Sequence, residues 1–203
     1  LKHGDHVIVT NYSCPASLSS VMVGGYGPVF CEINEHGNMD PKQLPDLMSP
    51  KVKGLVATGL YGDMHDHEAI KKFCDDNNIV YVNDAAQSQF ALCNGVDSLA
   101  CGDTVATSFA DNKPIPTIGT YGAILTDDDA VYDMVRALRK NGKATHDEPY
   151  MMAHQYPVYI SPNRRNAAKL ALKDKQERVS AVTQARDDIK NSLSEEQLED
   201  PNL

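Results

Sequence analysis

The amino-acid sequence predicts an α/β protein, a three-layer sandwich built around a mainly parallel sheet. Short apolar runs alternate with helical segments over most of the chain. This alternation is typical of parallel strands joined by right-handed crossovers. Several of the runs are rich in Val, Ile and Leu, as expected for strands covered on both faces. Polar residues follow several runs directly, and in such sheets ligands bind beyond the carboxyl ends of the strands.

Six strands are expected from their apolar, β-branched composition. In chain order they are HVIVT at residues 6–10, PVFC at 28–31, GLVAT at 54–58, IVYV at 79–82, TVATS at 104–108 and GAIL at 122–125. Tyr12, Tyr61, Asp84 and Ser108 each lie at or just beyond the end of a different strand. Parallel strands end at one edge, so these four residues should converge on a single rim.

Five helices are expected between the strands, at residues 15–23, 41–48, 65–77, 85–92 and 128–140. The third has the clearest pattern, because Ala69, Ile70 and Phe73 fall at helical spacing. Asp66 is suited to cap its start, and the polar run 75–78 to end it. Residues 143–159 are expected to form a loop excursion, residues 162–178 a helix, and the rest a polar tail.

Composition excludes several classes of function. A chain of 203 residues is long enough for one sizeable core, and its net charge of −9 argues against nucleic-acid binding. No apolar run approaches the roughly 20 residues of a membrane span, and no signal peptide is evident. Five cysteines without a CxxC pair indicate reduced thiols in a cytoplasmic protein. The acidic and histidine-rich stretch 65–68 falls at a helix start, so no metal site is expected.

Two polar stretches carry most of the chemical information. Asn83-Asp84-Ala85-Ala86-Gln87-Ser88 follows the fourth strand, and Ser108-Phe109-Ala110-Asp111-Asn112-Lys113 follows the fifth. An acid and a lysine at the ends of neighbouring strands meet the needs of pyridoxal phosphate chemistry. The acid keeps the pyridine nitrogen protonated, and the lysine amine binds the aldehyde carbon.

These stretches, together with others in the same order, resemble the DegT-type sugar aminotransferases, which are fold-type-I pyridoxal phosphate enzymes. The other matching stretches are Gly4-Asp5-His6-Val7-Ile8-Val9, Pro28-Val29-Phe30, Leu60-Tyr61-Gly62, Gly102-Asp103 and Tyr121-Gly122-Ala123-Ile124-Leu125-Thr126. The similarity is collinear over residues 4–172. No single stretch is decisive, but the ordered set is specific.

The resemblance implies a role for each of several residues. Lys113 would be the catalytic lysine that binds the cofactor, rather than a surface lysine. Asp84 would pair with the pyridine nitrogen; the alternative is that it caps the helix expected at 85–92. Gln87 would face the phenolic oxygen, or be an ordinary polar residue of the helix's first turn. Ala86 would press on one face of the ring, and Ser108 would bind phosphate or stabilise a turn.

Several positions depart from the family pattern. Cys14 stands where an aromatic residue usually stacks on the ring, so either Tyr12 replaces it or stacking is weaker. Residues 110–112 replace a more usual run before the lysine, and residues 160–164 match poorly. The family's Gly-Ser/Thr phosphate loop and most of its small C-terminal domain have no counterpart. Residues 1–142 are therefore expected to form an N-terminally incomplete cofactor-binding large domain, and residues 143–203 to lead toward an incomplete C-terminal domain.

The implied function is transfer of an amino group from an amino acid, glutamate by analogy with the family, to a nucleotide-linked keto sugar. A homodimer in the cytoplasm is implied as well, with polysaccharide biosynthesis as the usual setting. Some sugar dehydratases of the family carry His in place of the lysine, so Lys113 favours amino transfer. Three alternatives stay open: a truncated or degenerate non-catalytic domain, a sugar dehydratase and an amino-acid transaminase.

Overall fold

The computed structural model describes residues 1–116 and 121–139. Its strands are β1 (His6–Thr10), β2 (Gly27–Cys31), β3 (Val52–Thr58), β4 (Val80–Asp84), β5 (Leu92–Cys93), β6 (Val96–Asp97), β7 (Thr104–Ser108) and β8 (Gly122–Thr126). Its α-helices are α1 (Pro15–Val23), α2 (His67–Asn77) and α3 (Asp129–Arg139), with two 3-10 helices, η1 (Pro41–Leu47) and η2 (Ser98–Ala100). The loop and helix expected after residue 142 lie outside the described residues.

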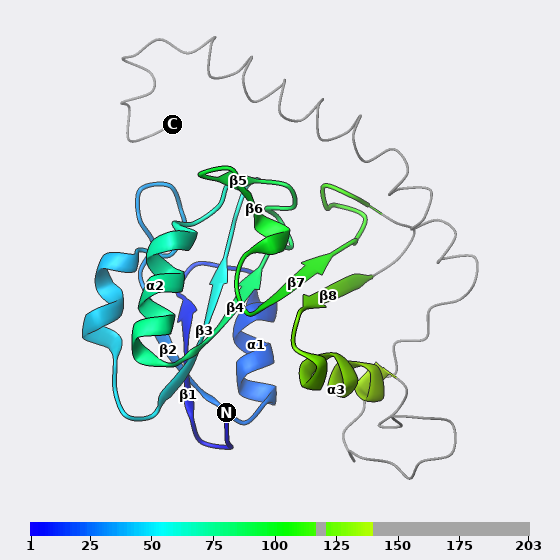
Figure 1. The fold of residues 1–203 in the computed structure, drawn as a ribbon. Coiled ribbons are helices and arrows are strands. Elements are labelled where there is room, and N and C mark those ends of the chain that lie inside the picture. The colour runs from blue at the N-terminus through cyan, green and yellow to red at the C-terminus, as the bar shows by residue number, and fades with distance from the viewer. Residues whose placement is uncertain (117–120, 140–203) are drawn as a thin grey trace, which may run out of the picture.

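The main sheet has six strands in the order β2-β1-β3-β4-β7-β8 (Figure 1). All its neighbouring strands are parallel except β8, which runs antiparallel to β7. These are the six strands that the apolar runs predict, with ends displaced by two residues or fewer. A short hairpin, β5-β6, forms a separate sheet. The predicted α/β class with a mainly parallel sheet is thus confirmed.

Helices cover the sheet on both faces, which gives three layers. Val7 and Val9 of β1 pack with Val21 of α1. Ile8, between them in sequence, belongs instead to a cluster with Ile70 of α2 and residues of η1. Successive strand residues point to opposite faces, so α1 lies on one face and α2 with η1 on the other (Figure 1). The sheet therefore has a core on each side, as the Val- and Ile-rich strands predict.

The helices begin and end where local chemistry allows. Asp66 caps α2, its carboxylate accepting a hydrogen bond from Ala69 N at 3.0 Å, and Asn78 ends the helix in the left-handed conformation at φ +52°. Both features agree with the prediction for residues 65–77. The helix expected at 41–48 forms as a 3-10 helix, because Pro45 inside it has no N–H to donate to an α-helical hydrogen bond.

The helix predicted at residues 85–92 is wrong, because this segment is a loop that ends in β5. Gln89 explains the difference. Its amide nitrogen donates to Thr107 Oγ1 at 2.6 Å and to the carbonyl oxygen of Ser108 at 2.8 Å, and its Oε1 accepts from Ile115 N at 3.2 Å. Phe90 has a positive φ of 65°, which interrupts a right-handed helix. Hydrogen bonds to β7 and the following loop therefore replace those of a helix.

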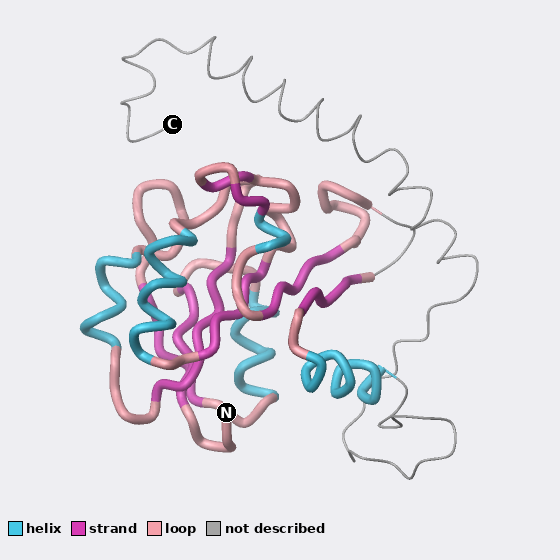
Figure 2. Tube along the Cα trace, in the orientation of Figure 1, coloured by secondary structure: helices cyan, strands magenta, loops and turns pink. Residues whose placement is uncertain are grey.

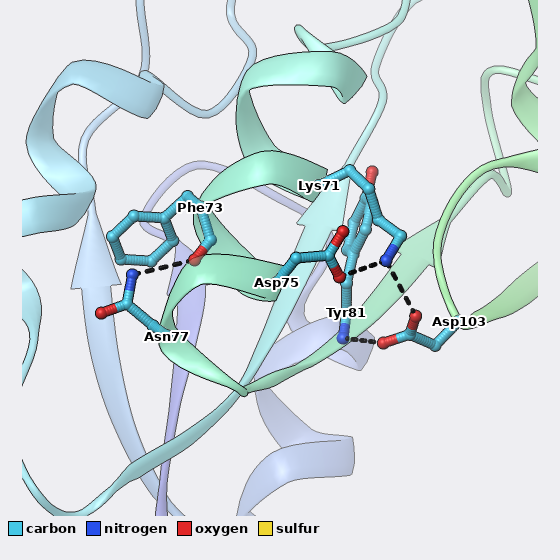
Figure 3. A network of polar contacts seen from close by, with 6 residues as sticks. All are labelled: Lys71, Phe73, Asp75, Asn77, Tyr81 and Asp103. Atoms are coloured by element: carbon cyan, nitrogen blue, oxygen red, sulfur yellow. Dashed lines mark hydrogen bonds and ion pairs between the residues drawn. The ribbon is translucent and has the colours of Figure 1, made fainter.

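Polar contacts join α2 to the strands beside it (Figure 3). Asp103, just before β7, accepts a hydrogen bond from the backbone N–H of Tyr81 at 2.8 Å, and its other oxygen lies 3.5 Å from Lys71 Nζ. Lys71 also pairs with Asp75 one turn along its own helix. The interactions of Lys71 with the two carboxylates raise its pKa, and the hydrogen bond to Asp75 contributes most.

Replacing Asp103 with alanine should lower the free energy of unfolding by about 1–2 kcal/mol, because the Tyr81 N–H loses its acceptor. Asp103→Asn keeps an acceptor oxygen and should recover most of the loss. Lys71→Met removes the ion pairs with Asp75 and Asp103 but leaves the Tyr81 N–H its acceptor, and it should cost less than about 1 kcal/mol. Urea unfolding of the three variants measures the difference. Equal losses in Asp103→Ala and Lys71→Met would assign the effect to the ion pair instead.

Candidate active site

The carboxyl ends of the parallel strands carry the candidate site, and the loops that follow them gather at one edge of the sheet (Figure 2). Tyr12 follows β1, Tyr61 follows β3, and Asp84 and Ser108 end β4 and β7. The hydroxyls of Tyr12 and Tyr61, 49 residues apart in sequence, lie 2.6 Å from each other. The predicted convergence is confirmed for these two residues by a direct contact.

Asp84 is held by hydrogen bonds to both carboxylate oxygens. Ser17 of α1 donates to Oδ2 at 2.9 Å, and the backbone N–H of Ala86 donates to Oδ1 at 3.1 Å. No helix begins at Ala85, so Asp84 caps none and that alternative is wrong. Asp84 is half-buried. Each carboxylate oxygen has a further lone pair besides the one that accepts from Ser17 or from Ala86 N. Asp84 can therefore accept a further hydrogen bond from a cationic ligand.

A cavity of about 390 Å³ lies beside this edge, lined by Tyr61, Gly62, Gln87, Asn112, Lys113 and Pro114. It brings together Lys113 and Gln87, which come from the two stretches singled out in the sequence. The backbone carbonyl oxygen of Gln87 accepts a hydrogen bond from Gly62 N at 3.0 Å. Its side-chain Oε1 lies 3.5 Å from Tyr61 N, a weaker contact. The lining of the cavity thus includes a primary amine and an amide.

The other predicted site residues do not line the cavity. Tyr12 reaches it through the hydroxyl of Tyr61. Ala86 follows Asp84 directly and donates its N–H to that carboxylate. The hydroxyl of Ser108 accepts from Ala110 N at 3.3 Å, so it stabilises the turn after β7, the alternative considered for it.

Three hydroxyl residues around Asp84 were not among the predicted site residues: Ser13, Ser17 and Thr58. Thr58 had one signal in the sequence, because it ends a predicted strand as Ser108 does, and it is the direct strand neighbour of Asp84 in β4. Ser13 and Ser17 had none, because Ser13 precedes α1 and Ser17 meets Asp84 only once α1 packs on the sheet. The cavity residues Asn112 and Pro114 flank the lysine in sequence and had no signal of their own.

Tyr61 at the site and the buried thiols of the chain are all held in their neutral forms at neutral pH. The hydrogen bond to Tyr12 raises the pKa of Tyr61, so this hydroxyl stays protonated at neutral pH. All five cysteines are free thiols. Burial raises the pKa of Cys31 and Cys101 to about 11 and that of Cys74 to about 12, which makes these thiols unreactive. Cys14, beside Ser13, is exposed.

The histidines of stretch 65–68 have structural partners. His65 is buried, and its Nε2 shares a hydrogen bond with the hydroxyl of Tyr81. The ring of His67 stacks on Tyr81 at a centroid distance of 5.7 Å, and Asp66 caps α2. Within residues 1–116 and 121–139, no group of three His, Cys, Asp or Glu residues is arranged to hold a metal ion. Among the same residues, no helix is both long and apolar enough to cross a membrane.

Known proteins place the fold and the sequence in one family. The model of the DegT/DnrJ/EryC1/StrS aminotransferase family matches residues 1–199. UDP-2-acetamido-2-deoxy-3-oxo-D-glucuronate aminotransferase of Pseudomonas aeruginosa is 32% identical over 141 residues, 69% of this chain and 39% of its own. A pleiotropic regulatory protein of Geobacillus stearothermophilus is 34% identical over 140 residues, 68% of this chain and 38% of its own.

A solved structure gives the same result. DesV of S. venezuelae, determined in complex with a ketimine intermediate, superposes with a TM-score of 0.80 at 26% identity. The match covers 87% of this chain and 47% of DesV. The chain thus spans 38–47% of the length of these relatives. With a family match over nearly its whole length and the same fold, the chain belongs to the DegT/DnrJ/EryC1/StrS aminotransferase family.

Proposed function

We propose that this chain is the cofactor-binding part of a pyridoxal phosphate-dependent aminotransferase. Such an enzyme would move an amino group from an amino acid, glutamate by family analogy, to a nucleotide-linked keto sugar. The observation that carries the proposal is the cavity shared by Lys113 and Gln87, at the same sheet edge as the hydrogen-bonded carboxylate of Asp84. Enzymes of the family use pyridoxal phosphate, and the Pseudomonas relative is named for a nucleotide-sugar substrate.

The donor set fits pyridoxal phosphate. Asp84 offers a carboxylate for the pyridine nitrogen, and Gln87 an amide for the phenolic oxygen. Lys113 offers an amine for the aldehyde carbon, and the side chain of Ala86 is small enough for a ring face to pack on it. When bound, the cofactor supplies an electron sink for the carbon that gives up its proton. Ser108 would contact the phosphate of the cofactor, and Tyr12 would contact its ring.

Lys113 has two tasks in this scheme. Its amine would hold the cofactor at the aldehyde carbon until the amine of the donor takes its place. The freed amine would then act as a general base and as a general acid in a 1,3-proton shift. Lys113 would serve in the same two roles when the keto sugar takes up the amino group. We further propose a cytoplasmic homodimer, a setting in which the five thiols stay reduced.

Addition of pyridoxal phosphate to the purified 203-residue chain should give a visible absorption band. Borohydride reduction followed by peptide mass mapping should then place the phosphopyridoxyl group on Lys113. Lys113→Ala should abolish the labelled peptide, whereas Lys72→Ala, on the exposed face of α2, should leave it unchanged. Absence of the band, or label spread over surface lysines, would overturn the proposal and favour a non-catalytic domain. Incubation of the unreduced, cofactor-loaded protein with glutamate and keto sugar nucleotides then separates amino transfer from dehydration by the product formed.

A further inference from the structure

Three hydroxyls form a connected hydrogen-bond chain behind Asp84. Ser17 of α1 contacts the carboxylate at 2.9 Å. Thr58 of β3 lies 3.4 Å from Ser17, and Ser13, in the loop before α1, lies 3.3 Å from Thr58 and 3.0 Å from Ser17. Ser17 and Thr58 are buried, with 7% and 2% of their surface exposed. Buried hydroxyls are costly unless hydrogen-bonded, so these contacts are a fixed part of the fold.

The chemistry of the groups sets the direction of this chain. An ionised carboxylate only accepts, so the single proton of Ser17 points to Asp84. Ser17 then has no proton to donate to Ser13 or Thr58. The one proton of Ser13 goes to Thr58, so Ser13 does not also donate to Ser17, and Thr58 donates its own proton to Ser17. The donors therefore follow one another from Ser13 through Thr58 and Ser17 to the carboxylate, an arrangement in which each hydrogen bond strengthens the next.

The hydroxyls of Ser17 and Thr58 hold the Asp84 carboxylate from the helix layer and from the sheet. Thr58 and Asp84 are direct neighbours on the parallel strands β3 and β4. Ser17 reaches Asp84 from α1, which lies on one face of the sheet, while Ala86 N holds the other oxygen from the loop beyond β4. With one donor on each oxygen, rotation of the carboxylate would break at least one hydrogen bond.

We propose that Ser17 is a positioning residue, backed by Thr58 and Ser13, that holds the Asp84 carboxylate in place for the ring nitrogen of the cofactor. The inference rests on the proposed function, because it gives Asp84 a ligand to meet. It adds a residue on α1, outside the two sequence stretches that carry Asp84 and Lys113. Ser17 acts only through Asp84, so its contribution must depend on the atom that Asp84 faces.

The test compares pyridoxal phosphate with 1-deazapyridoxal 5'-phosphate, which has carbon in place of the ring nitrogen but keeps the aldehyde and the phosphate. Dissociation constants of both compounds are measured by absorbance titration of the full chain. Ser17→Ala should weaken pyridoxal phosphate about tenfold, the effect of one hydrogen bond to a charged group, and the deaza compound less than about twofold. Ser17→Thr keeps the hydroxyl and should bind like wild type. Thr58→Val should weaken pyridoxal phosphate by about threefold.

Ser19→Ala is the matched control, because Ser19 lies on the same helix but donates its hydrogen bond to the backbone carbonyl oxygen of Pro15, away from Asp84. It should leave both constants unchanged. Equal weakening of the two compounds by Ser17→Ala would show a merely structural role and overturn the inference, as would no weakening of either. Failure of wild type to bind pyridoxal phosphate would instead refute the proposed function, and the inference with it. Borohydride trapping on wild-type Lys113 identifies which of the two has failed.

Discussion

Replacement of Asp84 by alanine should weaken pyridoxal phosphate binding by about 100-fold. The carboxylate is half-buried and already oriented by Ser17 and Ala86, so it meets a protonated pyridine nitrogen without reorganisation. Removal of one partner of such a hydrogen-bonded charge pair costs about 2–5 kcal/mol, largely because the other charge is left unpaired. At about 1.4 kcal/mol per tenfold change, a loss of about 2.8 kcal/mol, in the lower half of that range, corresponds to 100-fold. Absorbance titration of the 203-residue chain with the cofactor measures it.

Two further variants separate charge from shape at this position. Asp84→Asn keeps the size and one acceptor oxygen, so it should fold normally but bind the cofactor at least tenfold less tightly, since the charge is lost. Asp66→Ala is the matched control, because it removes an aspartate that caps α2 and has no hydrogen bond to the site. That variant should lose about 1 kcal/mol of stability and no affinity. If Asp84→Ala bound pyridoxal phosphate within threefold of wild type, the assigned role of Asp84 would be wrong.

The sheet was predictable because its central strands are covered by helices on both faces. Residues 7–10 are buried and residues 54–58 are buried or nearly so, on both faces of the sheet, and such positions favour runs of apolar residues. The rim followed from the same argument, because parallel strands end at one edge, and the contact between Tyr12 and Tyr61 agrees with it. Asp66 and Asn78 were predictable as helix ends because capping is decided within a few residues.

The loop after β4 was not predictable, because long-range contacts decide it. Gln89 bonds to Thr107, Ser108 and Ile115, and these partners are known only once β4 and β7 are neighbours. The support of Asp84 by Ser17, which is 67 residues away in sequence, depends likewise on where α1 lies over the sheet. Sequence patterns identify which residues carry chemistry, whereas the residues that hold them in place are fixed by tertiary structure.

Acid should destabilise the protein through His65, to an extent that a single variant can isolate. His65 is 1% exposed, and burial, followed by the nearby His67, lowers its pKa to about 4 from an ordinary value of 6.5. The folded state therefore holds the neutral ring while the unfolded state takes up a proton below pH 6.5. The stability contributed by the neutral ring is complete above pH 6.5 and falls as the pH drops toward 4. The difference between the pKa of His65 in the unfolded and the folded state corresponds to a loss of about 3 kcal/mol in the free energy of unfolding.

Urea unfolding at pH 7.5, 6.5, 5.5 and 4.5 compares wild type with His65→Gln, in which the residue cannot take up a proton. The variant should be less stable at pH 7.5, because it loses the hydrogen bond and packing to Tyr81, but its stability should fall less steeply with acid. The difference between the two proteins should shrink by up to about 3 kcal/mol over this range. His36→Gln, which alters an exposed histidine, should run parallel to wild type at every pH. Parallel curves for wild type and His65→Gln would mean that the buried imidazole is not the source of the acid sensitivity, leaving His67 and the carboxylates as its origin.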